Sequence, residues 1–267
     1  MSVTAPRRRG AVAVRGPFVI GLCLVGIGWC AALIAGRADG FFSELGAWDA
    51  SWYTEIARSG YGSAPDGAIR FFALFPAIAA VVDIVAPWSV AATLLMIAWI
   101  STLFGLRRLG ELARVEFGVA IARRSTWCLA LWPAAIALYL AYPTGLTVLS
   151  TAAALLALRQ SRWGAVAGWA ALAALARPTG VLLVVPIVWT LATERPRGWR
   201  PWCAVGAPAV GLMTMGAISN HIGEGRTGFS DAQAPLRGPW IDPISRTAQA
   251  VVDLAGRDVL DGLHLGG

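Results

Sequence analysis

Residues 89–106 read SVAATLLMIAWISTLFGL, a run of 18 residues without a charge that Arg107 and Arg108 follow directly. A helix needs about 20 mostly apolar residues, and no fewer than about 17, to cross the hydrocarbon core of a bilayer. The run therefore predicts a membrane-spanning helix that ends at a basic segment. The whole chain has the same character, since 57% of its 267 residues are hydrophobic and 14% are charged, whereas a soluble domain has about 25% charged residues. We expect an all-α integral membrane protein.

Apolar runs of similar length predict seven membrane spans in total. They lie at 17–36, 89–106, 125–142, 144–159, 164–177, 179–192 and 201–219. The stretch 71–88 is also apolar, but Pro76, Asp83 and Pro87 interrupt it. It favours an interfacial or re-entrant helix in the first outer loop over an eighth crossing. The predicted fold is a polytopic helix bundle with about seven spans.

The arginines orient this bundle, since the chain contains no lysine. Fourteen of the 22 arginines fall in the segments 1–16, 107–124, 159–163 and 193–200. Basic residues gather on the cytoplasmic side of polytopic proteins, so we place these segments and the N-terminus in the cytoplasm. Residues 1–219 then form one transmembrane domain, whose first outer loop is 37–70. Residues 220–267 form a second extracytoplasmic loop or tail.

Neither the cysteines nor the histidines predict a metal site. The four cysteines lie inside apolar runs, no CxxC pair exists, and His221 and His264 stand alone, so zinc ligands and a disulfide framework are not expected. The carboxylates show no metal spacing either. We predict no cofactor and leave a requirement for a divalent cation open. Nucleic acid is not an expected partner, because the arginines lie in short clusters between apolar runs.

The first outer loop contains the most informative motif, AWDASWYTEIARSGY at residues 47–61. A helix from about residue 50 places Trp48, Trp52 and Ile56 on one face, with Gly60 at its end. Trp and Tyr side chains prefer the headgroup level of a membrane. The motif thus predicts a helix that lies along the outer membrane interface.

Asp49 stands at the start of this predicted helix, within about one turn of Tyr53 and Glu55, and two roles are open to it. Its carboxylate can cap the helix by accepting a hydrogen bond from a backbone N–H. The same N–H groups and the helix dipole favour the ionised form. An ionised carboxylate beside an apolar face suits a general base that takes the proton of a hydroxyl group.

The motif at residues 48–61, followed by FFALFP at 71–76, resembles the first luminal loop of the PIG-V (GPI mannosyltransferase II) family, whose members are GT-C-fold membrane enzymes. Three further segments are similar, in the family's order: AYPT at 141–144, ARPTG at 176–180 and, more weakly, FSDAQ at 229–233. The family commonly has an acidic residue after the tyrosine near 142, where this chain reads YPTG. Its members are generally longer, so the resemblance is to a C-terminally short member.

The resemblance implies that an acceptor hydroxyl attacks the anomeric carbon of a polyprenyl-phosphate-mannose donor, with inversion. A phosphate leaving group needs no general acid, unlike the leaving group of glycoside hydrolysis, so one base and one cation suffice. Asp49 takes the place of the base. Arg177, at a predicted outer helix end, is expected to bind the lipid-linked phosphate, with snorkelling to the interface as its alternative role, and Arg70 is a second candidate. The remaining candidate donor- or substrate-binding residues are Trp48, Trp52, Tyr53, Glu55 and Gln233.

Two other functions stay open. A non-catalytic membrane scaffold is favoured by the absence of the acidic residue near Tyr142. A lipid or solute transporter is disfavoured because the predicted spans carry almost no charge and show no inverted repeat. The composition suits a bacterial plasma membrane, with the active site outside the cell. The expected partners are the polyprenyl-phosphate-mannose donor and a lipid or glycolipid acceptor of the cell envelope, whose identity the sequence leaves open.

Overall fold

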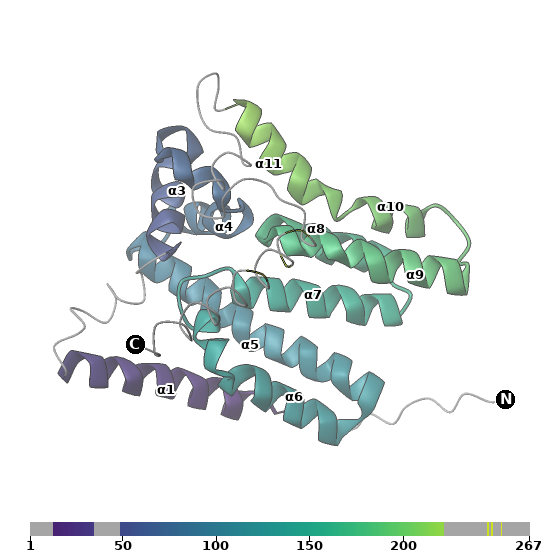
Figure 1. Ribbon diagram of the computed structural model, residues 1–267, viewed down its shortest axis with the longest axis horizontal. Helices are drawn as coiled ribbons and strands as arrows, with labels where there is room; N and C mark the ends of the chain where they lie inside the picture. Colours follow the sequence, from purple (N-terminus) through teal and green to yellow (C-terminus); the bar gives the residue numbers. More distant parts are fainter. Residues whose placement is uncertain (1–12, 35–48, 222–244, 246, 248–251, 253–267) are drawn as a thin grey trace, which may run out of the picture. The chain divides into compact units, whose positions relative to one another are not determined.

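Figure 1 shows the computed structural model of the chain, which describes residues 13–34, 49–221, 245, 247 and 252. The chain divides into two compact units, residues 1–226 and 227–267, and every element named below belongs to the first. In the described part of that unit all elements are helices, which confirms the predicted all-α class. In chain order they are α1 (Arg15–Ile34), α3 (Asp49–Ser63), η1 (Asp66–Arg70), α4 (Leu74–Asp83), α5 (Val90–Phe117), α6 (Val119–Leu131), η2 (Pro133–Leu138), α7 (Thr144–Arg159), α8 (Trp163–Ala176), η3 (Pro178–Leu183), α9 (Val184–Glu194), α10 (Arg200–Gly206) and α11 (Ala209–His221).

The helix α5 is the longest of the described elements, and it packs against α6 and α7 (Figure 1). Its N-terminal cap is Ser89, whose hydroxyl accepts a hydrogen bond from the Ala92 amide, as capping serines usually do. Gly118 ends the helix with a φ of 87°, a conformation that glycine adopts without steric cost. The helix therefore continues to Phe117, well past the end of the predicted span 89–106.

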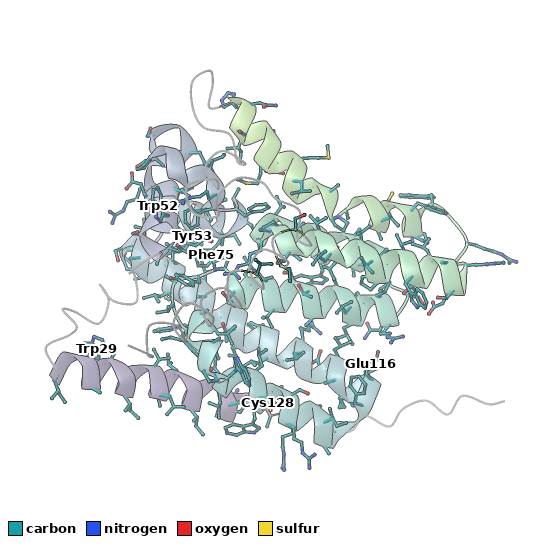
Figure 2. The ribbon with its side chains drawn as sticks, in the orientation of Figure 1. Trp29, Trp52, Tyr53, Phe75, Glu116 and Cys128 are labelled. Carbon is teal, nitrogen blue, oxygen red and sulfur yellow. The ribbon has the colours of Figure 1, made fainter. Side chains whose placement is uncertain are left out.

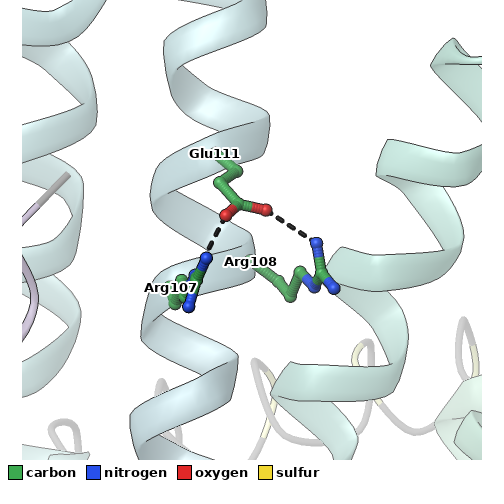
Figure 3. Close-up of polar contacts among 3 residues, drawn as sticks. All are labelled: Arg107, Arg108 and Glu111. Atoms are coloured by element: carbon green, nitrogen blue, oxygen red, sulfur yellow. Dashed lines mark hydrogen bonds and ion pairs between the residues drawn. The ribbon is translucent and has the colours of Figure 1, made fainter. Parts of the chain in front are cut away.

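Ion pairs on α5 explain why the basic segment after this span stays helical. The Glu111 carboxylate accepts hydrogen bonds from Arg107 Nε at 3.1 Å and from Arg108 Nη1 at 2.8 Å (Figure 3). Pairs three and four residues apart stabilise a helix by about 0.2–0.5 kcal/mol each. A further ion pair joins Glu116 of α5 to Arg159 of α7, so the C-terminal ends of these two helices lie together.

Prolines set the ends of several helices. The residue before a proline is driven out of the helical conformation, and both Trp132 (φ −60°, ψ 141°) and Arg177 (φ −154°, ψ 150°) are extended. Accordingly α6 ends at Leu131 and α8 ends at Ala176, and a short 3-10 helix follows each of them. The predicted span 125–142 is therefore not one continuous helix.

The interrupted stretch 71–88 forms the short helix α4, which ends at Asp83. Pro76 is accommodated in its first turn, where no backbone N–H is needed for the helix. Ten residues at about 1.5 Å each span about 15 Å, which is half of the bilayer core. This length suits the interfacial or re-entrant helix that the sequence favours.

Within the described residues, α5 is the one helix that is long and apolar enough to cross a membrane unaided. The pair α10 and α11 also qualifies when taken together, with a bend of 45° between the two helices. The other apolar helices are shorter, because prolines and glycines divide the apolar runs. An all-α bundle is thus established, and the seven-span arrangement stays a prediction.

Candidate functional site

The helix α3 carries the motif that the sequence singles out. Gly60, with φ 69° and ψ 172°, interrupts the helix, as the sequence predicts. The buried face consists of Ala50, Tyr53 and Ile56, whereas Trp52 is only partly buried. The predicted apolar face is confirmed for Ile56 and in part for Trp52, which packs against the same buried cluster. The prediction missed Tyr53, whose side chain contacts Phe71 and Phe75.

The Tyr53 ring contacts the rings of Phe71 and Phe75, and Figure 2 shows Tyr53 beside Phe75. Its centroid lies 5.1 Å from that of Phe71 and 5.2 Å from that of Phe75, and both pairs meet edge to face, the favoured geometry for aromatic rings. Tyr53 is only 6% exposed and Phe75 is fully buried. The ring position of Tyr53 is therefore fixed by packing, and its hydroxyl is fixed with it.

The chain contains two copies of the pentapeptide Ala-x-Pro-Thr-Gly, at 141–145 and 176–180. Both are distant from α3 in the sequence, but they lie near it in the structure. In each copy the proline lies at a helix boundary, and the variable position is Tyr142 in the first and Arg177 in the second. The alanines that precede them, Ala141 and Ala176, pack in the same buried cluster as Ala50 and Tyr53 of α3. The start of α3 therefore lies close to both breaks.

Arg177 is held at this place by a neighbouring hydroxyl. Its Nη2 atom donates a hydrogen bond of 3.2 Å to Thr144 Oγ1, at the first position of α7. Its charge acts on the hydroxyls of Tyr53 and Tyr142, and so does the charge of Asp49. Burial raises the pKa of the Tyr142 hydroxyl, and the nearby Asp49 backbone acts to lower it. These five residues form the candidate site.

The electrostatics of the site favour a neutral Tyr53. Burial raises the pKa of the Tyr53 hydroxyl well above its usual range, the positive charge of Arg177 acts to lower it, and the negative charge of Asp49 raises it again. Tyr53 therefore keeps its proton at neutral pH and is a hydrogen-bond donor. Asp49 itself is exposed at the start of α3 and forms no ion pair with any described arginine.

The alternative role of Asp49 as a helix cap gains no support from the hydrogen bonds. Asp49 is the first helical residue of α3, whereas a capping side chain belongs to the residue before it. Among the described residues, no hydrogen bond joins its carboxylate to an amide of the first turn. The Asp49 carboxylate is therefore exposed and is not bound by a described residue.

Arg70 and Trp52, two other predicted binding residues, lie on the far side of Phe71, the ring that also contacts Tyr53. The Arg70 guanidinium lies 5.4 Å from the Trp52 ring centroid and 5.7 Å from that of Phe71, and its Nε donates to the Gly67 carbonyl at 2.9 Å. The Trp52 and Phe71 rings are stacked, with centroids 5.7 Å apart. Arg70 therefore has a structural role here, in holding η1 against α3.

The other substrate-binding residues that the sequence predicts are not among the five residues of the candidate site. Glu55 accepts a hydrogen bond of 2.8 Å from the Ser59 hydroxyl, on the solvent side of α3. Trp48 and Gln233 lie outside the described residues. In the part of the chain that the structure describes, no group of three or more His, Cys, Asp or Glu side chains is placed to hold a metal ion.

Sequence reasoning missed Tyr142 and Thr144 as members of the site. The signal that identifies them is the repeated pentapeptide, because the second copy contains Arg177 and the first contains both missed residues. Comparison with protein-family models, curated proteins and solved structures finds no match for this chain. The family resemblance therefore rests on the sequence motifs alone.

Proposed function

We propose that this chain is a membrane glycosyltransferase that moves mannose from a polyprenyl-phosphate-mannose donor to a hydroxyl of a cell-envelope or lipid acceptor. The observation that carries the proposal is that one carboxylate, Asp49, and one guanidinium, Arg177, both lie close enough to the Tyr53 and Tyr142 hydroxyls for their charges to act on them. A carboxylate and a guanidinium in one site match the two charged tasks of the reaction, which are proton removal and phosphate stabilisation.

Asp49 is the general base of this reaction. Its exposed carboxylate takes the proton of the acceptor hydroxyl while the hydroxyl oxygen forms a bond to the anomeric carbon of mannose. The bond between that carbon and the phosphate oxygen breaks, and polyprenyl phosphate leaves with the electron pair. Because attack and departure occur on opposite faces of the sugar, the product is inverted.

Arg177 binds the phosphate that leaves. A guanidinium has five N–H donors. The bond to Thr144 fixes the side chain through Nη2, and no other hydrogen bond joins the Arg177 guanidinium to a described residue. A guanidinium fork matches the oxygens of a phosphate group. The charge that develops on the leaving oxygen is thereby stabilised.

Replacing Thr144 by Val tests whether the hydrogen bond that holds the Arg177 side chain contributes to phosphate binding. We expect about fivefold weaker binding of polyprenyl phosphate, because the variant loses a hydrogen bond that contributes about 1 kcal/mol to the placement of Arg177. Binding is measured by titration of the purified chain in detergent. Thr147→Val is the matched control on the same helix, because the Thr147 hydroxyl donates only to the Pro143 carbonyl. Equal affinity in the two variants would contradict the role of Thr144.

The surface of the described helices supports a membrane location. Large apolar side chains are exposed on α1, α4, α9 and α11, in numbers that a water-facing monomer rarely shows. Exposed tryptophans gather near helix ends, as in the aromatic belts of membrane proteins. They are Trp88, Trp132, Trp199 and Trp202, whereas the exposed Trp189 lies in the middle of α9. We therefore propose that the bundle crosses the plasma membrane with about seven spans.

The two ends of α7 support the proposed orientation. Thr144, in the candidate site, begins the helix, and Arg159, in the ion pair with Glu116, ends it. Sixteen residues at about 1.5 Å each separate these ends by about 24 Å. The arginine-rich end suits the cytoplasm, and the site then faces the outside of the cell.

The experiment that tests the function is transfer of radiolabelled mannose by the purified chain. Polyprenyl-phosphate-mannose is the donor, and a panel of envelope lipids supplies the acceptors. We expect label in an acceptor lipid with this donor and none with a nucleotide-linked mannose. Binding of the donor without transfer to any acceptor would favour the second candidate, a non-catalytic scaffold. The absence of an acidic residue after Tyr142 is the observation that supports this second candidate.

A further inference from the structure

The Tyr53 hydroxyl has no assigned partner, although its ring is deeply buried. All four tyrosines of the chain lie among the described residues. The Tyr61 hydroxyl donates to the Phe71 carbonyl at 2.5 Å and the Tyr139 hydroxyl donates to the Ala130 carbonyl at 3.3 Å, whereas Tyr142 is only partly buried. No hydrogen bond joins the Tyr53 hydroxyl to a described residue.

A buried phenol normally finds a hydrogen-bond partner, because leaving one unpaired costs about 1–3 kcal/mol. Tyr53 is 6% exposed, and its contacts with Phe71 and Phe75 fix the ring so that the hydroxyl cannot turn elsewhere. The Tyr53 oxygen is not fully enclosed by the described side chains, so a molecule that enters the site can accept its hydrogen bond. The packing of Ala141 and Ala176 beside Tyr53 places that molecule at the two pentapeptide breaks.

The charges around the hydroxyl indicate what this molecule offers. Tyr53 is a donor, so the partner atom must be an acceptor. The electrostatic influence of Arg177 on this hydroxyl is larger than that of Asp49, which favours an oxygen that carries negative charge. A phosphate oxygen is such an acceptor, and it also suits the guanidinium.

We propose that the Tyr53 hydroxyl donates a hydrogen bond to a phosphate oxygen that Arg177 binds at the same time. This inference rests on the proposed function and extends its phosphate subsite to a second, uncharged donor. The raised pKa of Tyr53 helps, since the group keeps its proton beside the anion. The phosphate can belong to a polyprenyl chain or be free in solution, and the two sources share this chemistry.

Tyr53→Phe isolates the hydroxyl, because it keeps the ring and both edge-to-face contacts. The purified full chain in detergent is titrated with polyprenyl phosphate and, separately, with inorganic phosphate. We expect Tyr53→Phe to weaken binding of polyprenyl phosphate at least about tenfold, the effect of losing a hydrogen bond to a charged group. The melting temperature should not fall, since no hydrogen bond within the described chain is lost.

Tyr61→Phe is the matched control, because its hydroxyl is used within the fold. We expect it to lower the melting temperature and to leave the affinity for polyprenyl phosphate unchanged. A loss in Tyr53→Phe with both probes assigns the bond to the phosphate group itself. A loss with the lipid probe alone assigns it to a lipid-linked phosphate.

Two results overturn the inference: unchanged affinity of Tyr53→Phe, or no binding of either probe by the wild-type chain. The proposed function fails separately. A wild-type chain that binds polyprenyl phosphate through Tyr53 but transfers no mannose refutes the transferase and leaves the phosphate subsite in place. A chain that transfers mannose while Tyr53→Phe binds normally refutes the subsite alone.

Discussion

Asp49→Asn is expected to reduce mannose transfer by a factor of about 10² to 10⁴, the usual contribution of a general base. Asparagine has the same shape as aspartate but cannot take a proton from the acceptor hydroxyl. The fold should be unaffected, because Asp49 is exposed and makes no ion pair with a described arginine. Initial rates of transfer from radiolabelled donor and thermal unfolding of the same preparation measure the two effects.

Glu55→Gln is the matched control for this experiment. It removes a second carboxylate from α3, one whose hydrogen bond is with Ser59 on the solvent side. We expect transfer close to that of the wild-type chain. If Asp49→Asn and Glu55→Gln transfer mannose equally well, Asp49 is not the base.

Gly180→Ala is expected to destabilise the bundle by about 1–3 kcal/mol or more, the cost of adding atoms to a packed interior. A Cβ at Gly180 would overlap the backbone of Ala173 and Ala174 in α8. Overlap with backbone cannot be relieved by a change of rotamer, so η3 must move away from α8. Arg177 lies at the start of η3, and we expect transfer to fall with stability.

Gly164→Ala, in the first turn of α8, is the control for Gly180→Ala. A Cβ there meets no atom within 4 Å, and alanine in a helix is more favourable than glycine by about 0.4–1 kcal/mol. Thermal unfolding in detergent should therefore show a higher melting temperature for Gly164→Ala and a lower one for Gly180→Ala. A Gly180→Ala variant as stable as the wild-type chain would mean that α8 and η3 are not in contact as described.

Much of the helical arrangement follows from local sequence signals. The helix α7 has the predicted bounds 144–159, and α8 differs from its predicted span by one residue at each end, because prolines and arginines mark these boundaries. The end of α6 at Leu131 does not follow from hydropathy, because the apolar run continues unbroken through Pro133. Hydropathy records that a residue is apolar, but it does not record that the residue before a proline cannot stay helical.

The candidate site was only partly predictable, because it depends on contacts between distant segments. Asp49 and Arg177 stand out in the sequence as an acid at a helix start and a lone arginine between apolar runs. The involvement of Tyr142 follows from the docking of α3 near the first pentapeptide break, which no local pattern encodes. The surroundings of Arg70 were unpredictable for a similar reason, because no local pattern encodes its packing against Trp52 beside Gly67, which has no side chain.

The proposed transferase requires α3 to lie outside the cell, where a lipid-linked sugar can reach Asp49. Single cysteines report this directly, in a background in which Cys23, Cys30, Cys128 and Cys203 are replaced by Ala. Arg58 of α3 and Arg123 of α6 are both exposed, and each is changed to Cys. With a membrane-impermeant maleimide, we expect Arg58→Cys to react in intact cells and Arg123→Cys to react only after permeabilisation. The reverse pattern would place Asp49 in the cytoplasm and contradict the proposed enzyme.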